Sequence, residues 1–238
     1  MSLTPQLPLA LRPAPDSRFD TFVGAPEVVG RLREMARGEP GFALLSGEEG
    51  SGKTHLAIAT AQAAAAAGIA VQYVPMARLG GLVERGVSGL ERLGLVLLDG
   101  LDAVLGSRED EVALFDFHNR CIASGCCVLY TAIAPAAGLA VGLPDLRSRL
   151  AQCIQLTLPR SDDALRAAIL QRKAQERGWV LEEAAVGYLL RRVGRDMASL
   201  AALLDRLDRA SLAQQRRVTV PLIRDVLEQA EKDAARPA

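Results

Sequence analysis

The sequence predicts a three-layer α/β protein with a five-stranded parallel sheet, followed by a small all-helical region. Three observations lead to this fold class. Five short apolar runs alternate with helical segments, the first run leads directly into a glycine-rich loop that opens a helix, and only helical periodicity remains after Pro159. Strands that alternate with helices favour a parallel sheet with helices on both faces.

The elements follow one another in a regular order. We expect strands at "GFALLSG", "IAVQYVP", "LGLVLLDG", "CCVLYTA" and "CIQLTL", and helices from Pro26 to near Gly38, from Thr54 to Ala67 and from Glu111 to Ser124. Four amphipathic helices follow Ser161, and the last has Thr219 as its cap and Pro221 in its first turn. The sequence therefore predicts a tail over 1–18, an α/β domain over 19–160 and a helical lid domain over 161–238.

The composition excludes several classes of function. The 238 residues include 28 Lys+Arg and 28 Asp+Glu, and a balanced charge exerts no global attraction on DNA or on a membrane. We see no signal peptide and no run long enough to span a bilayer. The four cysteines form no C-x-x-C pair, so a zinc site is not expected; Cys126 and Cys127 are interpreted as buried, reduced thiols of a cytoplasmic protein.

A phosphate-binding loop is the strongest motif in the sequence. "GEEGSGKT", residues 47–54, matches G-x-x-x-x-G-K-[ST] between a predicted strand and a predicted helix. The glycines let backbone amides point at phosphate oxygens, Lys53 reaches the β- and γ-phosphates, and Thr54 can bind Mg²⁺. We therefore predict ADP or ATP with Mg²⁺ as ligand, held by Gly47, Gly50, Ser51, Gly52, Lys53, Thr54 and His55.

A second acidic motif completes the predicted metal site. "LVLLDGLD" places Asp99 at the end of an apolar strand, where a carboxylate can hold Mg²⁺ or its water; a mere strand cap is the alternative. A hydrolysing ATPase usually has a second acid at the next position, which is Gly100 here. Asp102 lies in the following turn, and its reach to the site stays open.

One arginine motif follows the predicted fourth strand, and a second lies within the predicted lid. "PDLRSRL" contains Arg147 and Arg149, which diverge on a helix, and "GRDMASL" places Arg195 at the start of a lid helix. Each arginine is either a solvated charge or a contact to nucleotide phosphates, the latter in a neighbouring molecule for the first motif.

The amino-terminal stretch "TPQLPLALRP" is the other conspicuous segment. Its prolines exclude a helix, and alternate residues of an extended chain point the same way. Leu7, Leu9 and Leu11 therefore share one face beside the Gln6 amide. This peptide either packs on its own domain or binds another protein.

Taken in order, these motifs resemble those of AAA+ ATPases. "RFDTFVGAPEV" and "GKTHLAIA" are similar to the replication initiator DnaA. "FDFHNR", "LPDLRSRL" and "RDMASLAALLDRLDRASLAQQRRVTVPLIRDVL" resemble the Hda family, the DnaA-related regulatory inactivators. The resemblance runs from Gln6 to Leu227. We recognise no segment like the helix-turn-helix domain of DnaA, and the insertion before Asp99 is shorter, so we expect no direct sequence-specific DNA binding.

The resemblance implies partners and roles. "QLPLAL" matches the family's Q-L-x-L-x-L peptide, which binds the sliding clamp of DNA polymerase III, through Gln6, Leu7, Leu9 and Leu11. DnaA is the implied second partner, with Arg149 as the arginine finger that promotes hydrolysis of DnaA-bound ATP in trans. Arg195 would contact the chain's own nucleotide, and backbone near Phe22 and Val23 would line the adenine pocket. AAA+ sites lie at subunit interfaces, which leaves a homodimer open.

Departures from DnaA argue against strong intrinsic hydrolysis. Gly100 replaces the second acid, and Ile133 stands where DnaA has a polar sensor residue. The resemblance therefore implies a negative regulator of replication initiation that binds ADP and has weak or no ATPase activity. The alternatives are an autonomous ATPase motor or loader, a DnaA-type DNA binder, and a clamp-tethered adaptor for another client.

Overall fold

The centre of the computed structural model, which describes residues 17–160, 162–192, 203–204, 206–211 and 218–234, is a five-stranded sheet. The strands are β1 (Phe42–Ser46), β2 (Val71–Pro75), β3 (Leu95–Asp99), β4 (Cys127–Ala132) and β5 (Ile154–Thr157), in the order β2-β3-β4-β1-β5. Every neighbouring pair is parallel. The predicted fold class is therefore confirmed.

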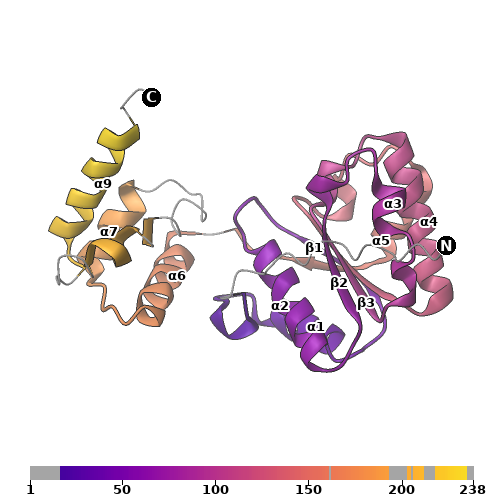
Figure 1. The fold of residues 1–238 in the computed structure, drawn as a ribbon, viewed down its shortest axis with the longest axis horizontal. Coiled ribbons are helices and arrows are strands. Elements are labelled where there is room, and N and C mark those ends of the chain that lie inside the picture. Colours follow the sequence, from indigo (N-terminus) through magenta and orange to yellow (C-terminus); the bar gives the residue numbers. More distant parts are fainter. Residues whose placement is uncertain (1–16, 161, 193–202, 205, 212–217, 235–238) are drawn as a thin grey trace, which may run out of the picture.

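Helices cover both faces of the sheet (Figure 1). α1 (Pro26–Met35) and α2 (Lys53–Ala66) share a core with Leu45, Leu97 and Leu129, whereas α4 (Arg108–Ser124) and α5 (Pro144–Gln152) share the other core with Leu44 and Tyr130. The short α3 (Val83–Val87) packs on α4. Successive strand residues point to opposite faces, so each strand contributes to both cores.

Two helices begin earlier than their sequence predicted. α4 begins at Arg108 rather than Glu111 because the Ser107 hydroxyl accepts a hydrogen bond from the Asp110 amide at 3.3 Å, which caps the helix. α2 begins at Lys53, directly after Gly52 in the left-handed conformation. Both shifts place charged side chains in a first helical turn.

Short 3₁₀ turns connect the larger elements at the ends of the strands. These are η1 (Phe19–Thr21), η2 (Met76–Arg78), η3 (Leu90–Arg92), η4 (Leu101–Ala103) and η5 (Ala136–Gly138). Because all five strands run in one direction, the segments that follow β1, β3 and β4 meet at the same edge of the sheet. Ligand sites of parallel sheets lie at this carboxyl edge.

The helices after β5 form their own core and gather apart from the sheet (Figure 1). α6 (Asp163–Glu176), α7 (Glu183–Arg192) and α9 (Val220–Ala234) bury leucines and valines against one another and against Leu203, Leu204 and Leu207. The Asp162 carboxylate caps α6 by accepting from the Leu165 amide at 2.7 Å. Thr219 immediately precedes α9, and Pro221 is in its first turn, where the sequence placed them. In the stretches that the structure describes, no helix is long and apolar enough to cross a membrane.

Candidate nucleotide-binding site

The loop between β1 and α2 contains glycines in conformations that other residues rarely adopt. Gly50 and Gly52 adopt left-handed φ angles of 74° and 97°. A Cβ on Gly52 would lie 2.6 Å from Cε2 of Phe22, and one on Gly47 would lie 2.6 Å from the Ser51 hydroxyl. The loop leads into the N-terminus of α2, where free amides and the helix dipole favour an anion.

Lys53 lies inside this loop and bridges its backbone. Its ammonium donates to the carbonyl oxygens of Gly47 at 2.6 Å and Glu48 at 2.8 Å. Partial burial lowers the pKa of Lys53, and the carboxylates of Asp102 and Asp99 oppose that shift. A partly desolvated cation held against this loop is suited to binding phosphate oxygens.

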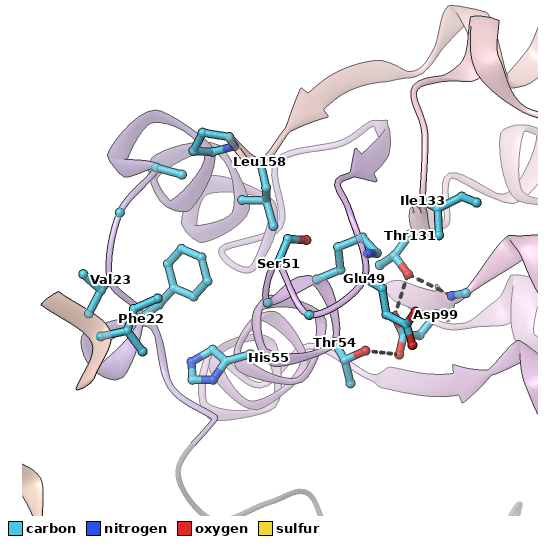
Figure 2. A pocket seen from close by; sticks show the side chains of 18 of the residues that line it. Phe22, Val23, Glu49, Ser51, Thr54, His55, Asp99, Thr131, Ile133 and Leu158 are labelled. Carbon is cyan, nitrogen blue, oxygen red and sulfur yellow. Dashed lines mark hydrogen bonds between the residues drawn. The ribbon is translucent and has the colours of Figure 1, made fainter. Parts of the chain in front are cut away.

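Asp99 is surrounded by hydroxyl groups at the end of β3. Thr54 donates to its Oδ2 at 2.9 Å, Tyr73 donates to the same oxygen at 2.7 Å, and Thr131 donates to Oδ1 at 2.6 Å. Figure 2 shows Thr54, Asp99 and Thr131 facing one another on one side of the cavity. The predicted metal pair Thr54 and Asp99 is thus in direct contact.

The sequence did not single out Tyr73 or Thr131. Both come from strands that neighbour β3: Tyr73 from β2, and Thr131 from β4, where it also accepts from the Gly100 amide at 2.8 Å. A polar residue near the carboxyl end of an apolar strand was the available signal. Strand order was needed to pair these residues with Asp99.

The structure also answers the open question about Asp102. Its Oδ2 accepts a hydrogen bond from the Ile133 amide at 2.9 Å, and the residue lines the same cavity as Lys53. Ile133 itself is 58% exposed and lines the cavity without offering a polar side chain. Asp102 therefore reaches the site, and Thr131 supplies a polar contact to Asp99 that Ile133 does not.

A cavity of about 670 Å³ extends from these polar groups to an apolar end. Binding sites for small molecules commonly have volumes of about 300–1,000 Å³. The apolar end is lined by Phe22, Val23, Leu165 and Ile169, the last two from α6. The Phe22 ring lies 5.6 Å from the His55 ring, and His55 Nε2 lies 2.9 Å from the Arg18 carbonyl oxygen. One end suits a planar base and the other suits phosphates.

The donor set fits a nucleotide with Mg²⁺. Among the described residues, the hydroxyl of Ser51 is buried and has no hydrogen-bond partner, although it lies on the loop that would cradle phosphate. Such an orphaned group is expected where a ligand oxygen normally binds. Across the described ranges, no cluster of three His, Cys, Asp or Glu side chains could bind a metal alone. A magnesium ion would therefore depend on Thr54, Asp99 and the phosphates together.

The remaining predicted residues lie elsewhere. Arg149 is on α5 and does not line the cavity, and its guanidinium makes no hydrogen bond or ion pair with any described residue. Arg147, on the same helix, donates to the Val141 carbonyl oxygen. Arg195 and the tail residues Gln6, Leu7, Leu9 and Leu11 lie outside the described residues. The four cysteines are buried free thiols, as the sequence led us to expect for Cys126 and Cys127.

Two family models match separate segments of the chain. Residues 163–227 match the model described as "Hda, lid domain", and residues 39–100 match "IstB-like ATP binding protein". The first covers most of the helical region after β5. The second covers the phosphate-binding loop and runs to the end of β3.

Solved structures show the same fold. Domain III of DnaA from Thermotoga maritima superposes with a TM-score of 0.76 at 19% identity, over 90% of this chain and 97% of that one. DnaA from Aquifex aeolicus bound to AMPPCP gives 0.68 at 19%, over 79% and 63%. The RuvB Holliday junction branch migration motor of Thermotoga maritima gives 0.68 at 20%, over 89% and 71%. At these identities the similarity concerns the fold.

Proposed function

Because the chain is a DnaA-like AAA+ protein with an Hda-type lid, we propose that it negatively regulates replication initiation by promoting hydrolysis of DnaA-bound ATP. Its own nucleotide, ADP or ATP, is then a ligand that orders the site. The sliding clamp of DNA polymerase III is the proposed tether, bound by the peptide "QLPLAL". DnaA, implied by the family resemblance, is the second proposed partner.

One observation carries this proposal. The cavity collects groups suited to binding phosphate, whereas Arg149 lies outside it and its guanidinium has no hydrogen bond or ion pair among the described residues. An unpaired arginine on an AAA+ domain is available to the nucleotide of a neighbouring subunit. An arginine finger supplied in trans is worth about 10³–10⁵ in hydrolysis rate.

The residues of the chain have distinct roles in this mechanism. Lys53 and the loop amides bind the phosphates of the chain's own nucleotide, while Phe22 and Val23 cover its base. Thr54 and Asp99 would hold Mg²⁺, which neutralises phosphate charge when it is bound. Gly100 has no side chain to orient a water, so hydrolysis of this nucleotide is slow. Arg149 instead stabilises charge that develops on the γ-phosphate held by DnaA.

Single-turnover hydrolysis tests the proposal. ATP is bound to DnaA first, clamp is loaded on DNA, and hydrolysis is followed with wild type, Arg149→Ala and Arg149→Lys. We expect both variants to lose roughly three orders of magnitude of the stimulation, because lysine lacks the planar fork of arginine. Arg147→Ala is the matched control, because that neighbouring guanidinium is already bonded to Val141.

A variant of the tail separates tethering from chemistry. Gln6→Ala/Leu7→Ala should abolish stimulation on clamp-loaded DNA by preventing clamp binding. If wild type binds clamp but leaves hydrolysis by DnaA unchanged, the adaptor alternative replaces the inactivator and the role of Arg149 is wrong.

An autonomous ATPase is the second candidate, and two contacts favour it. Asp102 lines the cavity near Lys53 and could replace the second acid that Gly100 lacks. Thr131 contacts Asp99 and could replace the polar side chain that Ile133 lacks. This candidate would be supported if the isolated protein turned over ATP and the substitution Asp102→Ala abolished that turnover. Absence of turnover in wild type would exclude it.

A further inference from the structure

Glu111 is a buried carboxylate that joins two loops. It lies on α4 and is 1% exposed. Its Oε1 accepts hydrogen bonds from the amides of Gly106 at 2.8 Å and Gly142 at 3.0 Å, and its Oε2 accepts from the Leu143 amide at 2.6 Å. The two oxygens thus bind three backbone groups from two different segments.

Both segments lead to functional elements. Gly106 follows η4, which begins directly after Asp99 and Gly100 and contains Asp102. Leu143 is the cap residue of α5, the helix that carries Arg149. Glu111 therefore connects the segment that leaves the nucleotide cavity with the start of the arginine helix.

The local packing favours an ionised carboxylate in a fixed position. Burial raises the pKa of Glu111, but the amides of Gly142, Gly106 and Leu143 outweigh it, so the pKa lies below its ordinary value. A Cβ on Gly142 would lie only 3.2 Å from Oε2, so glycine allows the backbone to approach this closely. A carboxylate with three backbone donors has little freedom to rotate.

The geometry points to Glu111 as a positioning residue for Arg149: it fixes the start of α5 against the segment that follows Asp99 and so orients the guanidinium toward a neighbouring molecule's phosphate. This inference rests on the proposed function. Glu111 does not line the cavity. Its effect on hydrolysis would pass entirely through α5.

The adjacent residue offers a matched comparison. Asp110 is also on α4, is 2% exposed, and accepts from the backbone amides of Gly81 at 2.8 Å and Val83 at 3.3 Å. Those amides lie at the start of α3 and not of α5. The two acids therefore make similar bonds from one helix to different destinations.

The test compares Glu111→Gln with Asp110→Asn in the full chain. Each amide keeps the shape of the acid but presents an NH₂ group to a backbone donor, so both should lose thermal stability. Only Glu111→Gln should speed amide hydrogen exchange over 143–152. It should also lower the maximal rate of stimulated DnaA hydrolysis by at least about tenfold, because small displacements of a catalytic group are costly.

Two further measurements separate positioning from general damage. The affinity for ADP and the DnaA concentration at half-maximal stimulation should stay within about twofold of wild type in Glu111→Gln. Gly142→Ala is the milder variant should Glu111→Gln fail to fold, since its methyl group displaces the carboxylate slightly, and its effect should be intermediate.

The outcomes distinguish this inference from the proposed function. Equal effects of the two acids on exchange in α5, or unchanged exchange in Glu111→Gln, would overturn the positioning role. If exchange in α5 rises only in Glu111→Gln but wild type leaves DnaA hydrolysis unstimulated, the proposed function has failed. The positioning role then falls with it, although the connection between α4 and α5 is real.

Discussion

The nucleotide cavity and helix α5 use charged side chains in opposite ways. In the cavity, Lys53 donates to two loop carbonyls, and Asp99 accepts from three hydroxyls. On α5, the guanidinium of Arg149 has no hydrogen bond or ion pair with the described residues. This contrast supports the proposed roles, in which the first site holds a ligand of its own and the second offers a cation to another molecule.

The largest effect is expected where the cavity loses its cation. Lys53→Ala should weaken ADP binding by between about 30-fold and about 5,000-fold, since removing one member of a desolvated charge pair costs about 2–5 kcal/mol. Calorimetric titration of ADP with Mg²⁺ measures this, and the ligand-induced rise in melting temperature should disappear with it.

Arg160→Ala is the control for this loss. Arg160 forms an exposed ion pair with Glu48 on the same loop at 2.8 Å, and exposed pairs contribute about 0–1 kcal/mol. A Lys53→Ala protein that binds ADP as tightly as wild type would contradict the assignment of the cavity. The contrast between the cavity and α5 would then fail, because the cavity would not be a nucleotide site.

The contrast between the cavity and α5 could be predicted from the sequence only where it depends on the spacing of residues within one motif. The loop over 47–54 carries its glycines, lysine and threonine in a fixed order, and each lies where the motif requires. The role of Arg149 in trans, by contrast, was implied by the family resemblance and not by spacing. The five strands were predictable because apolar runs between helices satisfy a parallel sheet.

Contacts between strands could not be predicted in the same way. Thr131 faces Asp99 because Leu98 pairs with Tyr130 in the register of β3 and β4, and Tyr73 does so because β2 is the other neighbour of β3. Strand order is a property of the whole sheet, so no local pattern reveals it. The amides bound by Glu111 were hidden for the same reason, since Gly142 and Leu143 lie far along the chain.

A second prediction concerns His118, which lies on α4 against the sheet. His118 is buried, its Nδ1 lies 2.9 Å from the Tyr130 hydroxyl, and its ring lies 4.3 Å from that of Phe42. Burial first, and the charge of Arg149 second, lower the pKa of His118 to about 4 from 6.5. The unfolded chain binds this proton below pH 6.5, so stability should fall as the pH drops from 6.5 toward 4.

Chemical denaturation across that range measures the effect. In His118→Gln the loss of unfolding free energy between pH 7 and 4.5 should be smaller by about 2 kcal/mol, after allowance for partial solvation. Arg149→Ala should reduce the same pH dependence only slightly, because its charge is the lesser cause. Identical slopes in wild type and His118→Gln would show that the folded protein does not hold His118 in its neutral form.

The smallest expected effect concerns the hydrogen bonds around Asp99 in the cavity. Burial, followed by the hydrogen bond to Asp99, raises the pKa of Tyr73, so its phenol stays a donor at neutral pH. This donor and Thr54 share one oxygen of Asp99, where a magnesium-bound water would also need an acceptor. Tyr73→Phe should therefore increase the gain in ADP affinity that Mg²⁺ provides, by about 3- to 10-fold, the value of one modest hydrogen bond.

Titrations of ADP in EDTA and in excess Mg²⁺ give this ratio for each protein. Thr131→Val is the control, because it removes a donor from the other oxygen of Asp99 and also deprives the Gly100 amide of its acceptor. A ratio that rises in Tyr73→Phe but not in Thr131→Val locates the competition at Oδ2. An unchanged ratio in Tyr73→Phe would mean that the hydroxyls around Asp99 orient the carboxylate for the ion. The hydrogen bond from Tyr73 would then not compete with Mg²⁺ for Asp99.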